Sequence, residues 1–134
     1  MAGPLFCVLL FFSVIAQAGV ENISNEKLKS LLDGGAILVD IRTRGEWQET
    51  GIIEGSHTLT LFDELGRPVA DFVPQLQKIA DKATPVIVIC RTGNRTRAAS
   101  DALTRQIGYQ TVYNVTNGIT DWIAKGYPVI PYKP

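Results

Sequence analysis

Short apolar runs alternate along the chain with segments whose apolar side chains recur at helical spacing. The runs at 36–39 and 86–89 are unbroken, contain Ile and Val, and each follows a turn-forming stretch. This pattern is typical of strands buried on both faces of a parallel sheet. We expect a shorter run at 111–113, and a turn into a short strand within 51–61, to add further strands.

The segments between these strands have the apolar spacing of amphipathic helices. They cover residues 24–32, a short stretch around Glu46 and Trp47, and residues 69–80, 96–107 and 118–124. Ser24 is a suitable N-cap for the first helix, Pro74 requires the third to begin or bend near it, and Gly108 closes the fourth. We expect Trp47 and Trp122 to pack in the core. The alternation predicts an α/β domain, a small parallel sheet with helices on both faces.

Residues 1–18 differ in composition from the rest of the chain. Leu5 to Ile15 is a nearly unbroken apolar run, a small-x-small pattern ends at Ala18, and the first charged side chain is Glu21. These features predict a secretory signal peptide that is cleaved after Ala18 and leaves residues 19–134 as a single domain. The alternatives are an uncleaved anchor or the buried first helix of a cytosolic protein.

Composition and charge narrow the classes of function. The 134 residues are 46% hydrophobic and 19% charged, which suits one globular domain. Thirteen basic and thirteen acidic residues cancel, and no basic run could follow a phosphate backbone, so we expect no nucleic-acid partner. In the mature protein one cysteine and one histidine do not make a metal-ligand set, so we expect no metal. We also expect no cofactor. Cys7 would leave with the signal peptide, so the mature protein would keep one thiol, Cys90, and form no internal disulfide.

Cys90 is the candidate for chemistry. It follows the strand at 86–89, and a polar loop with one glycine leads from it into the next helix. Ligands of open α/β sheets bind at the carboxyl ends of the strands, and N–H groups at a helix start favour negative charge. The segment contains three arginines, which are unfavourable in a hydrophobic core and add positive charge near the thiol: Arg91, Arg95 and Arg97. We therefore expect a reactive thiolate rather than an inert, buried core thiol.

Four segments together resemble the single-domain rhodaneses, sulfurtransferases that carry sulfane sulfur as a cysteine persulfide. Cys-Arg-Thr-Gly-Asn-Arg at 90–95 resembles the active-site loop of that family. Residues 38–47, 51–56 and 113–122 resemble its VDVR…EW, GHIPGA and L.GG…W segments, in the same order. The resemblance covers the chain from about Val20 to its end, and it implies a rhodanese-like three-layer domain with a five-stranded sheet.

The chain departs from the family pattern within 51–56. Ile52 stands where the family has a histidine and Glu54 where it has a proline, and the one histidine, His57, lies five residues after position 52. We expect His57 to be structural, because sulfur transfer needs no histidine base when the loop itself holds the thiolate. A Cys–His dyad would need that base, but no second feature supports it.

The resemblance implies a reaction in two halves. The Cys90 thiolate takes the outer sulfur of thiosulfate or a related small anionic donor and holds it as a persulfide, and cyanide or a thiol then accepts it. The residues implied in substrate binding are Arg91, Thr92, Gly93, Asn94 and Arg95. Their backbone N–H groups would hold negative charge, Gly93 would allow a tight turn, and Arg91 and Arg95 would contact the donor.

We consider two pairs of charged residues that could lie near the Cys90 loop. Asp40 and Arg42 follow the strand at 36–39, so they are expected at the same sheet edge as Cys90. They would either form an ion pair that supports the loop or cap the next turn. Arg97 would face solvent or pair with Asp101, four residues on.

Export would place the protein in the periplasm or outside the cell. Three Asn-x-Ser/Thr triplets, at Asn22, Asn94 and Asn114, match the N-glycosylation pattern. A glycan at Asn94 would sit on the active loop, so a bacterial periplasm is the more coherent destination. No stable membrane insertion is expected after cleavage, because the apolar run leaves with the signal.

Three other functions stay open at this point. A cysteine-dependent phosphatase uses similar electrostatics, but its loop needs an arginine after five intervening residues, and that position is Thr96, between Arg95 and Arg97. A persulfide carrier without efficient turnover has the same loop chemistry as an enzyme. A third alternative is a binding module of related fold without catalytic activity. Its main sequence feature would be the absence of the cysteine, which is present here as Cys90.

Overall fold

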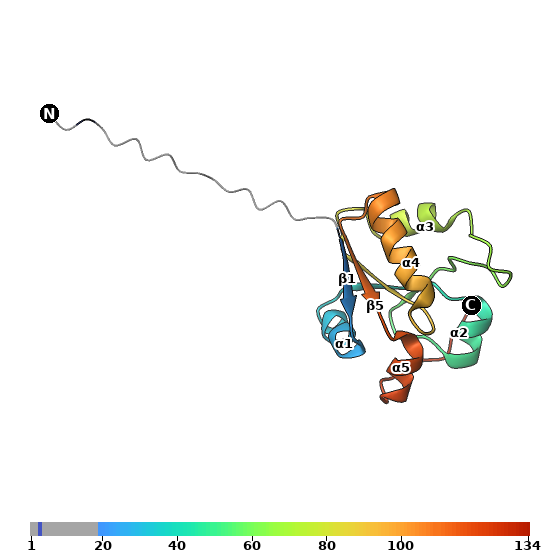
Figure 1. The fold of residues 1–134 in the computed structure, drawn as a ribbon. Helices are drawn as coiled ribbons and strands as arrows, with labels where there is room; N and C mark the ends of the chain where they lie inside the picture. Colours follow the sequence, from blue (N-terminus) through green and yellow to red (C-terminus); the bar gives the residue numbers. More distant parts are fainter. Residues whose placement is uncertain (1–2, 4–18) are drawn as a thin grey trace.

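The structure, a computed structural model, describes residues 3 and 19–134, and residues 19–134 fold around one five-stranded sheet (Figure 1). The elements in chain order are β1 (Gly19–Ile23), α1 (Asn25–Asp33), β2 (Ile37–Asp40), α2 (Arg44–Thr50), β3 (His57–Thr58), α3 (Phe72–Ile79), β4 (Val86–Ile89), α4 (Asn94–Ala102), η1 (Leu103–Ile107), β5 (Thr111–Val115) and α5 (Gly118–Ala124). The predicted signal peptide, except for Gly3, lies outside the described residues. Among the described helices, none has the length and apolar character needed to cross a membrane.

The sheet has the strand order β1-β5-β4-β2-β3, and every neighbouring pair is parallel. β4 is therefore the central strand, between β5 and β2. The register pairs Asp40, the last residue of β2, with Ile89, the last residue of β4. Because parallel strands end at the same edge of the sheet, the residues that follow β2 and β4 come together there.

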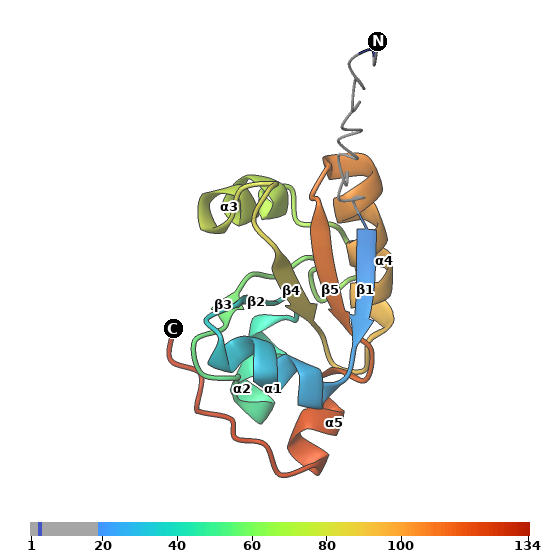
Figure 2. The ribbon, with the colours of Figure 1, turned by 90° about the vertical axis from the view of Figure 1, so that its left-hand side faces the viewer.

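Side chains alternate along β4 between two apolar layers. Val86, Val88 and Cys90 belong to the layer that α3 and α4 cover, whereas Ile87 and Ile89 belong to the layer that α1 and α5 cover. Figure 2 shows α1 and α4 on opposite sides of the sheet. The predicted α/β class, with helices on both faces of a small parallel sheet, is confirmed.

Local sequence explains most of the helix boundaries. Ser24 Oγ accepts a hydrogen bond of 3.1 Å from the N–H three residues on, which confirms it as an N-cap. Pro74 lies in the first turn of α3, where its missing N–H has no intrahelical partner to lose, so the helix begins near it. The helix expected at 96–107 begins earlier, at Asn94, and its last turn is the π-helical η1, which Gly108 closes.

Two strands differ from the sequence prediction. β1 is absent from that prediction because three of its five residues are exposed and it has no apolar period. Pairing with β5 alone holds it at one edge of the sheet. The strand expected within 51–61 is only the two-residue β3 at the opposite edge, where His57 is exposed. Trp47 and Trp122 are buried, as expected.

Candidate active site

Cys90 lies directly after the central strand β4, at the carboxyl edge of the sheet, as predicted. The residue is only 1% exposed. Gly93 N–H donates a hydrogen bond of 3.2 Å to Cys90 Sγ, and Thr96 Oγ1 lies 3.5 Å from the same sulfur. The sulfur is therefore buried, but a backbone donor and a hydroxyl face it, and such a setting can hold a sulfur anion.

The loop after Cys90 is fixed by hydrogen bonds from α5. Ile119 N–H donates to the carbonyl oxygen of Cys90 at 2.9 Å, and Thr120 N–H donates to that of Arg91 at 3.1 Å. Two loop carbonyls thus accept from the first turn of α5, whose own first N–H groups have no intrahelical acceptor. This arrangement holds the backbone of Cys90 and Arg91 through their carbonyl oxygens and does not involve the thiol.

Two glycines let the loop approach the β5–α5 turn closely. Gly93 has a φ of +96°, and a Cβ there would collide with the carbonyl oxygen of Thr116. Gly118, on the facing turn, has a φ of +65°, and a Cβ there would collide with the carbonyl oxygen of Arg91. The tight turn expected at Gly93 is therefore present, and it depends on backbone-to-backbone packing.

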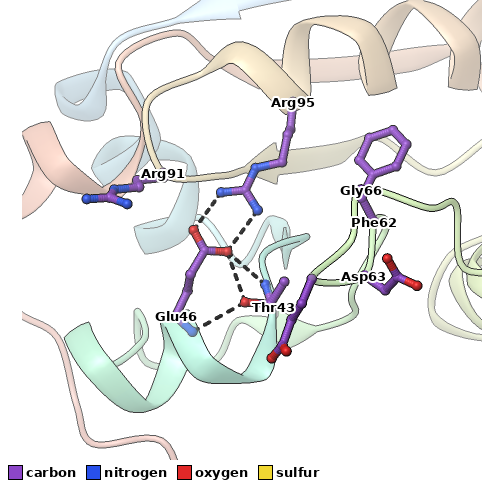
Figure 3. Close-up of a pocket in the computed structure, with 8 residues that line it drawn as sticks. Thr43, Glu46, Phe62, Asp63, Gly66, Arg91 and Arg95 are labelled. Atoms are coloured by element: carbon purple, nitrogen blue, oxygen red, sulfur yellow. Dashed lines mark hydrogen bonds and ion pairs between the residues drawn. The ribbon is translucent and has the colours of Figure 1, made fainter.

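Glu46 and Arg95 form a bidentate ion pair beside the loop (Figure 3). Arg95 Nη1 donates to Glu46 Oε2 at 2.8 Å and Nη2 donates to Oε1 at 2.7 Å. Glu46 Oε2 also accepts from the backbone N–H of Thr43 at 3.0 Å, which completes a capping box at the start of α2. Burial raises the pKa of Glu46, but the hydrogen bonds from Arg95 and Thr43 outweigh it and lower that pKa to about 2. The hydrogen bond to Glu46 raises the pKa of Arg95 in turn.

The other polar residues of the loop make no side-chain hydrogen bond with this pair. Arg91 and Thr92 are exposed, and Arg91 makes no side-chain hydrogen bond or ion pair with any residue that the structure describes. Asn94 Oδ1 accepts from Arg97 Nη2 at 3.2 Å. Arg97 faces solvent and does not pair with Asp101, because Asp101 pairs with Arg105 instead.

Asp40 and Arg42 form an ion pair, and both side chains are only 1% exposed. Asp40 Oδ1 also accepts from the backbone N–H of Arg42 at 3.2 Å, so the ion pair and the cap of the next turn, which the sequence left as alternatives, are both present. Arg42 Nη2 donates to Asp40 Oδ2 at 2.8 Å and to Gly51 O at 3.0 Å, and Nη1 donates to Thr50 Oγ1 at 2.8 Å. The pair therefore ties the end of β2 to the end of α2. It supports the helix that carries Glu46.

Two cavities adjoin the loop. A cavity of about 560 Å³ opens over the Glu46–Arg95 pair, and Thr43, Phe62, Asp63, Glu64, Gly66 and Arg91 complete its lining. A narrower cavity of about 210 Å³ lies between α2 and α5. Arg91 lines both cavities, and its side chain points away from the Glu46–Arg95 pair in Figure 3. Within the described part of the chain, no three His, Cys, Asp or Glu side chains are grouped so that they could hold a metal ion.

Sequence reasoning missed two residues of the site. The Glu46 carboxylate has no recognisable partner in the sequence, although Thr43-x-x-Glu46 is a capping-box pattern that would have placed it at the start of a helix. Thr96 is informative in the sequence only as a position that lacks arginine, whereas in the structure its hydroxyl lies beside Sγ.

Comparison with known proteins agrees with this geometry. The family model for the rhodanese-like domain matches residues 24–125. A thiosulfate sulfurtransferase GlpE of Pseudomonas savastanoi pv. phaseolicola is 32% identical over 108 residues, which are 81% of this chain and 91% of that protein. Rv0390 of M. tuberculosis shares the fold with a TM-score of 0.72 at 24% identity, covering 87% of this chain and all of that one.

A second solved structure extends the comparison. A rhodanese-related protein from Thermoplasma volcanium is 28% identical, with a TM-score of 0.60, and the match covers 83% of this chain and 98% of that chain. The family match begins at Ser24 and ends at Lys125, so it includes the Cys90 loop, the Glu46–Arg95 pair and the Asp40–Arg42 pair. This protein belongs to the rhodanese-like domain family.

Proposed function

We propose that the protein is a sulfurtransferase that moves sulfane sulfur from thiosulfate, or a related anionic donor, to cyanide or a thiol through a persulfide on Cys90. The hydrogen bond from Gly93 N–H to the buried Sγ carries this proposal, because a fixed donor stabilises negative charge on sulfur in the thiolate. Family membership, and a relative named thiosulfate sulfurtransferase at 32% identity, support the class of reaction.

The donor half-reaction forms one bond and breaks one. The Cys90 thiolate attacks the outer sulfur of thiosulfate, a new S–S bond forms, and the old one breaks. The electron pair of the broken bond leaves with sulfite. The three negative charges of the reactants are thus shared between the persulfide and sulfite, and no proton is needed. A site that stabilises anions without a nearby acid therefore suits this step.

The two loop cations have different surroundings. Arg91 is exposed and unpaired among the described residues, so it is the guanidinium that can meet an anionic donor. Arg95 is held by Glu46, which occupies two of its donors and neutralises its charge. We assign donor contact to Arg91 and assign to Arg95 the positioning of the loop.

The acceptor half-reaction returns the enzyme to its first state. Cyanide or a thiolate attacks the terminal sulfur of the persulfide, and the bond between that sulfur and Sγ breaks. The electron pair returns to Cys90. The second step thus needs the same anion-stabilising environment as the first, and Gly93 N–H serves both.

Intact mass tests the proposal directly. Purified protein is treated with thiosulfate and its mass is compared with that of Cys90→Ser treated in the same way. The expected result is a gain of one sulfur atom by the wild type only, which cyanide then removes as thiocyanate. Absence of that gain, with hydrolysis of p-nitrophenyl phosphate instead, would replace the proposal with the phosphatase function. A gain that cyanide or a thiol removes only in a single slow turnover would indicate a persulfide carrier.

The residue at position 96 favours sulfur transfer over phosphate hydrolysis. Thr96 stands six positions after Cys90, where a phosphatase loop needs its arginine, and it is fully buried. The adjacent Arg95 is occupied by Glu46, and Arg97 faces solvent and contacts Asn94. A tetrahedral phosphate on Cys90 would therefore lack a bidentate arginine partner.

A further inference from the structure

The first turn of α5 fixes the direction of two peptide groups in the reactive loop. The carbonyl oxygens of Cys90 and Arg91 accept from Ile119 N–H at 2.9 Å and from Thr120 N–H at 3.1 Å. The peptide bonds that these carbonyls begin are trans, and in a trans peptide the N–H points opposite to the C=O. The N–H groups of Arg91 and Thr92 therefore point away from α5.

The Cys90 side chain also lies away from α5. Cys90 packs in the apolar layer that α3 and α4 cover, whereas Ile119 of α5 packs in the layer on the other face of the sheet. Gly93 N–H, the next along the loop, donates to Cys90 Sγ, and the N–H groups of Arg91 and Thr92 have no acceptor among the described residues. The direction of two loop carbonyls thus determines where the loop presents donors for negative charge.

Asn25, the first residue of α1, holds the same turn of α5 from another helix. Its Nδ2 donates to Gly118 O at 3.1 Å and to Asp121 Oδ2 at 2.8 Å. The turn has no cap of its own, because the side chain of Asn117 makes no capping hydrogen bond. Arg91 O occupies the space where Gly118 would carry a Cβ, so a shift of this turn is transmitted directly to the loop.

The stability of α1 does not explain an asparagine at position 25. Asn25 is fully buried and its Oδ1 has no hydrogen-bond partner among the described residues, which costs free energy. Ser24 already caps α1. Glu26 joins α1 to the C-terminal end of α5 through Lys125, at 2.7 Å, without burying a polar group. An apolar residue at position 25 would avoid the cost, but it would not hold the first turn of α5.

We propose that Asn25 is a positioning residue for sulfur transfer: its amide holds the first turn of α5, and that turn keeps the loop N–H groups directed away from α5, on the side of the Cys90 sulfur. The inference rests on the proposed function, because these N–H groups matter only when negative charge develops on sulfur. Asn25 contacts no reacting atom and moves no proton. It sets the loop geometry in which the thiolate and the persulfide meet their donors.

The first turnover of Asn25→Leu with thiosulfate tests this role. Leucine keeps the branched shape of asparagine and cannot donate to Gly118 or Asp121. The gain of sulfur is timed by intact mass at about pH 7 and at about pH 10, where a thiol is ionised without help from its surroundings.

The expected result is a loss of rate that depends on pH. One net hydrogen bond changes a thiolate population by up to about tenfold, and a compensating change in nucleophilicity offsets about half of this on a logarithmic scale. Asn25→Leu should therefore gain sulfur about threefold more slowly than the wild type at about pH 7. At about pH 10 it should not be slower, because the thiolate then forms in both proteins.

Tyr109→Phe is the matched control. Like Asn25, Tyr109 is fully buried, and it donates to a backbone carbonyl distant in the sequence, that of Ala80, at 2.8 Å. Both variants leave a buried carbonyl without its side-chain donor, but Ala80 follows α3 and not the turn that holds the loop. Urea denaturation should show that Tyr109→Phe is destabilised, while its rate of sulfur gain stays that of the wild type.

Thr120→Pro tests the contact at the loop and does not depend on the folding of Asn25→Leu. It removes the N–H that binds Arg91 O, and proline is tolerated in the first turn of a helix. Sulfur gain at about pH 7 should slow at least as much as in Asn25→Leu, by about threefold or more.

Three results would overturn the positioning role: wild-type rates in Asn25→Leu or Thr120→Pro, equal slowing at both pH values, or the same slowing in Tyr109→Phe. A wild type that gains no sulfur would overturn the proposed function as well. Normal gain by the wild type and by Asn25→Leu alike would overturn the role of Asn25 alone.

Discussion

Glu46 and Arg95, separated by 49 residues in the sequence, meet through two hydrogen bonds of 2.7 and 2.8 Å that join α2 to the first turn of α4. The loop that carries Cys90 ends where α4 begins, so this pair fixes the far end of the loop. α2 is fixed in its turn, because Arg42 binds Thr50 and Gly51 at its C-terminus. The nucleophile therefore depends on a helix that contributes no atom to the reaction.

Removal of the Glu46 carboxylate should weaken both the fold and the site. In Glu46→Gln the bidentate pair is lost, and we expect unfolding to need about 1–2 kcal/mol less free energy, because hydrogen bonds between charged groups are worth more than neutral ones. Asp101→Asn removes a carboxylate from an exposed pair with Arg105 and should cost less than about 0.5 kcal/mol. Urea denaturation of the two variants measures the difference, and equal losses would contradict the structural role of Glu46.

The stability that the Glu46–Arg95 pair contributes should depend on pH. The pKa of Glu46 falls from its usual 4.5 to about 2 in the folded protein. A lowered folded pKa gives stability that is complete above the unfolded value and is lost as pH falls from about 4.5 towards 2. The stability gap between wild type and Glu46→Gln should therefore be constant near neutral pH and shrink below pH 4.5. Thermal unfolding of both proteins across this range provides the measurement, and a gap that widens on acidification would show the opposite linkage.

The buried pair of Asp40 and Arg42 should be the most costly charge pair to break. Asp40→Asn leaves the buried Arg42 guanidinium uncompensated, which typically costs about 3–5 kcal/mol. Asp33→Asn, in the exposed pair with Lys29, should cost less than about 0.5 kcal/mol. Denaturation midpoints compare the two losses. A small loss in Asp40→Asn would mean that water or another group reaches Arg42.

The sequence predicts those elements that are marked by their own residues. It misses those that form only because a segment distant in the sequence packs or pairs with them. The helix at 118–124 is bounded as expected, and Cys90 lies where the strand at 86–89 ends, because apolar runs and glycines mark these places directly. β1 has no such signal, since only its pairing with β5 makes it a strand. The partner of Arg95 is equally hidden, because only the fold brings α2 beside α4.

Gly93 provides a test of the close approach between two backbones. Gly93→Ala must place a Cβ against the carbonyl oxygen of Thr116 at a positive φ, so we expect a loss of about 2–5 kcal/mol. Gly126→Ala is the control, because Gly126 has a φ of +79° but open space where its Cβ would be. It should lose only about 1 kcal/mol, from the backbone alone. Similar losses in both variants would show that the loop can move away from Thr116.

Substitutions at Thr96 can distinguish the effect of its hydroxyl on the Cys90 sulfur from the effect of its side chain on packing. Its Oγ1 lies 3.5 Å from Cys90 Sγ and donates to Gly93 O at 3.2 Å, so its proton can also turn to the sulfur once the thiol ionises. Thr96→Val keeps the shape and removes the hydroxyl, and it should slow persulfide formation by about tenfold, the factor for a hydrogen bond worth about 1.4 kcal/mol.

Two control variants show whether a slower rate in Thr96→Val comes from loss of the hydroxyl beside the sulfur or from a change in the helix. Thr96→Ser restores the hydroxyl and should recover most of the rate, even though it loses a methyl group from a buried site. Thr104→Val removes a hydroxyl that donates only to backbone carbonyls of Ser100 and Asp101, further along the same helix. It should lower stability without slowing the first turnover with thiosulfate. If Thr96→Val and Thr104→Val reduce rate and stability alike, the hydroxyl at position 96 serves the helix and not the sulfur, and Gly93 N–H alone would hold the thiolate.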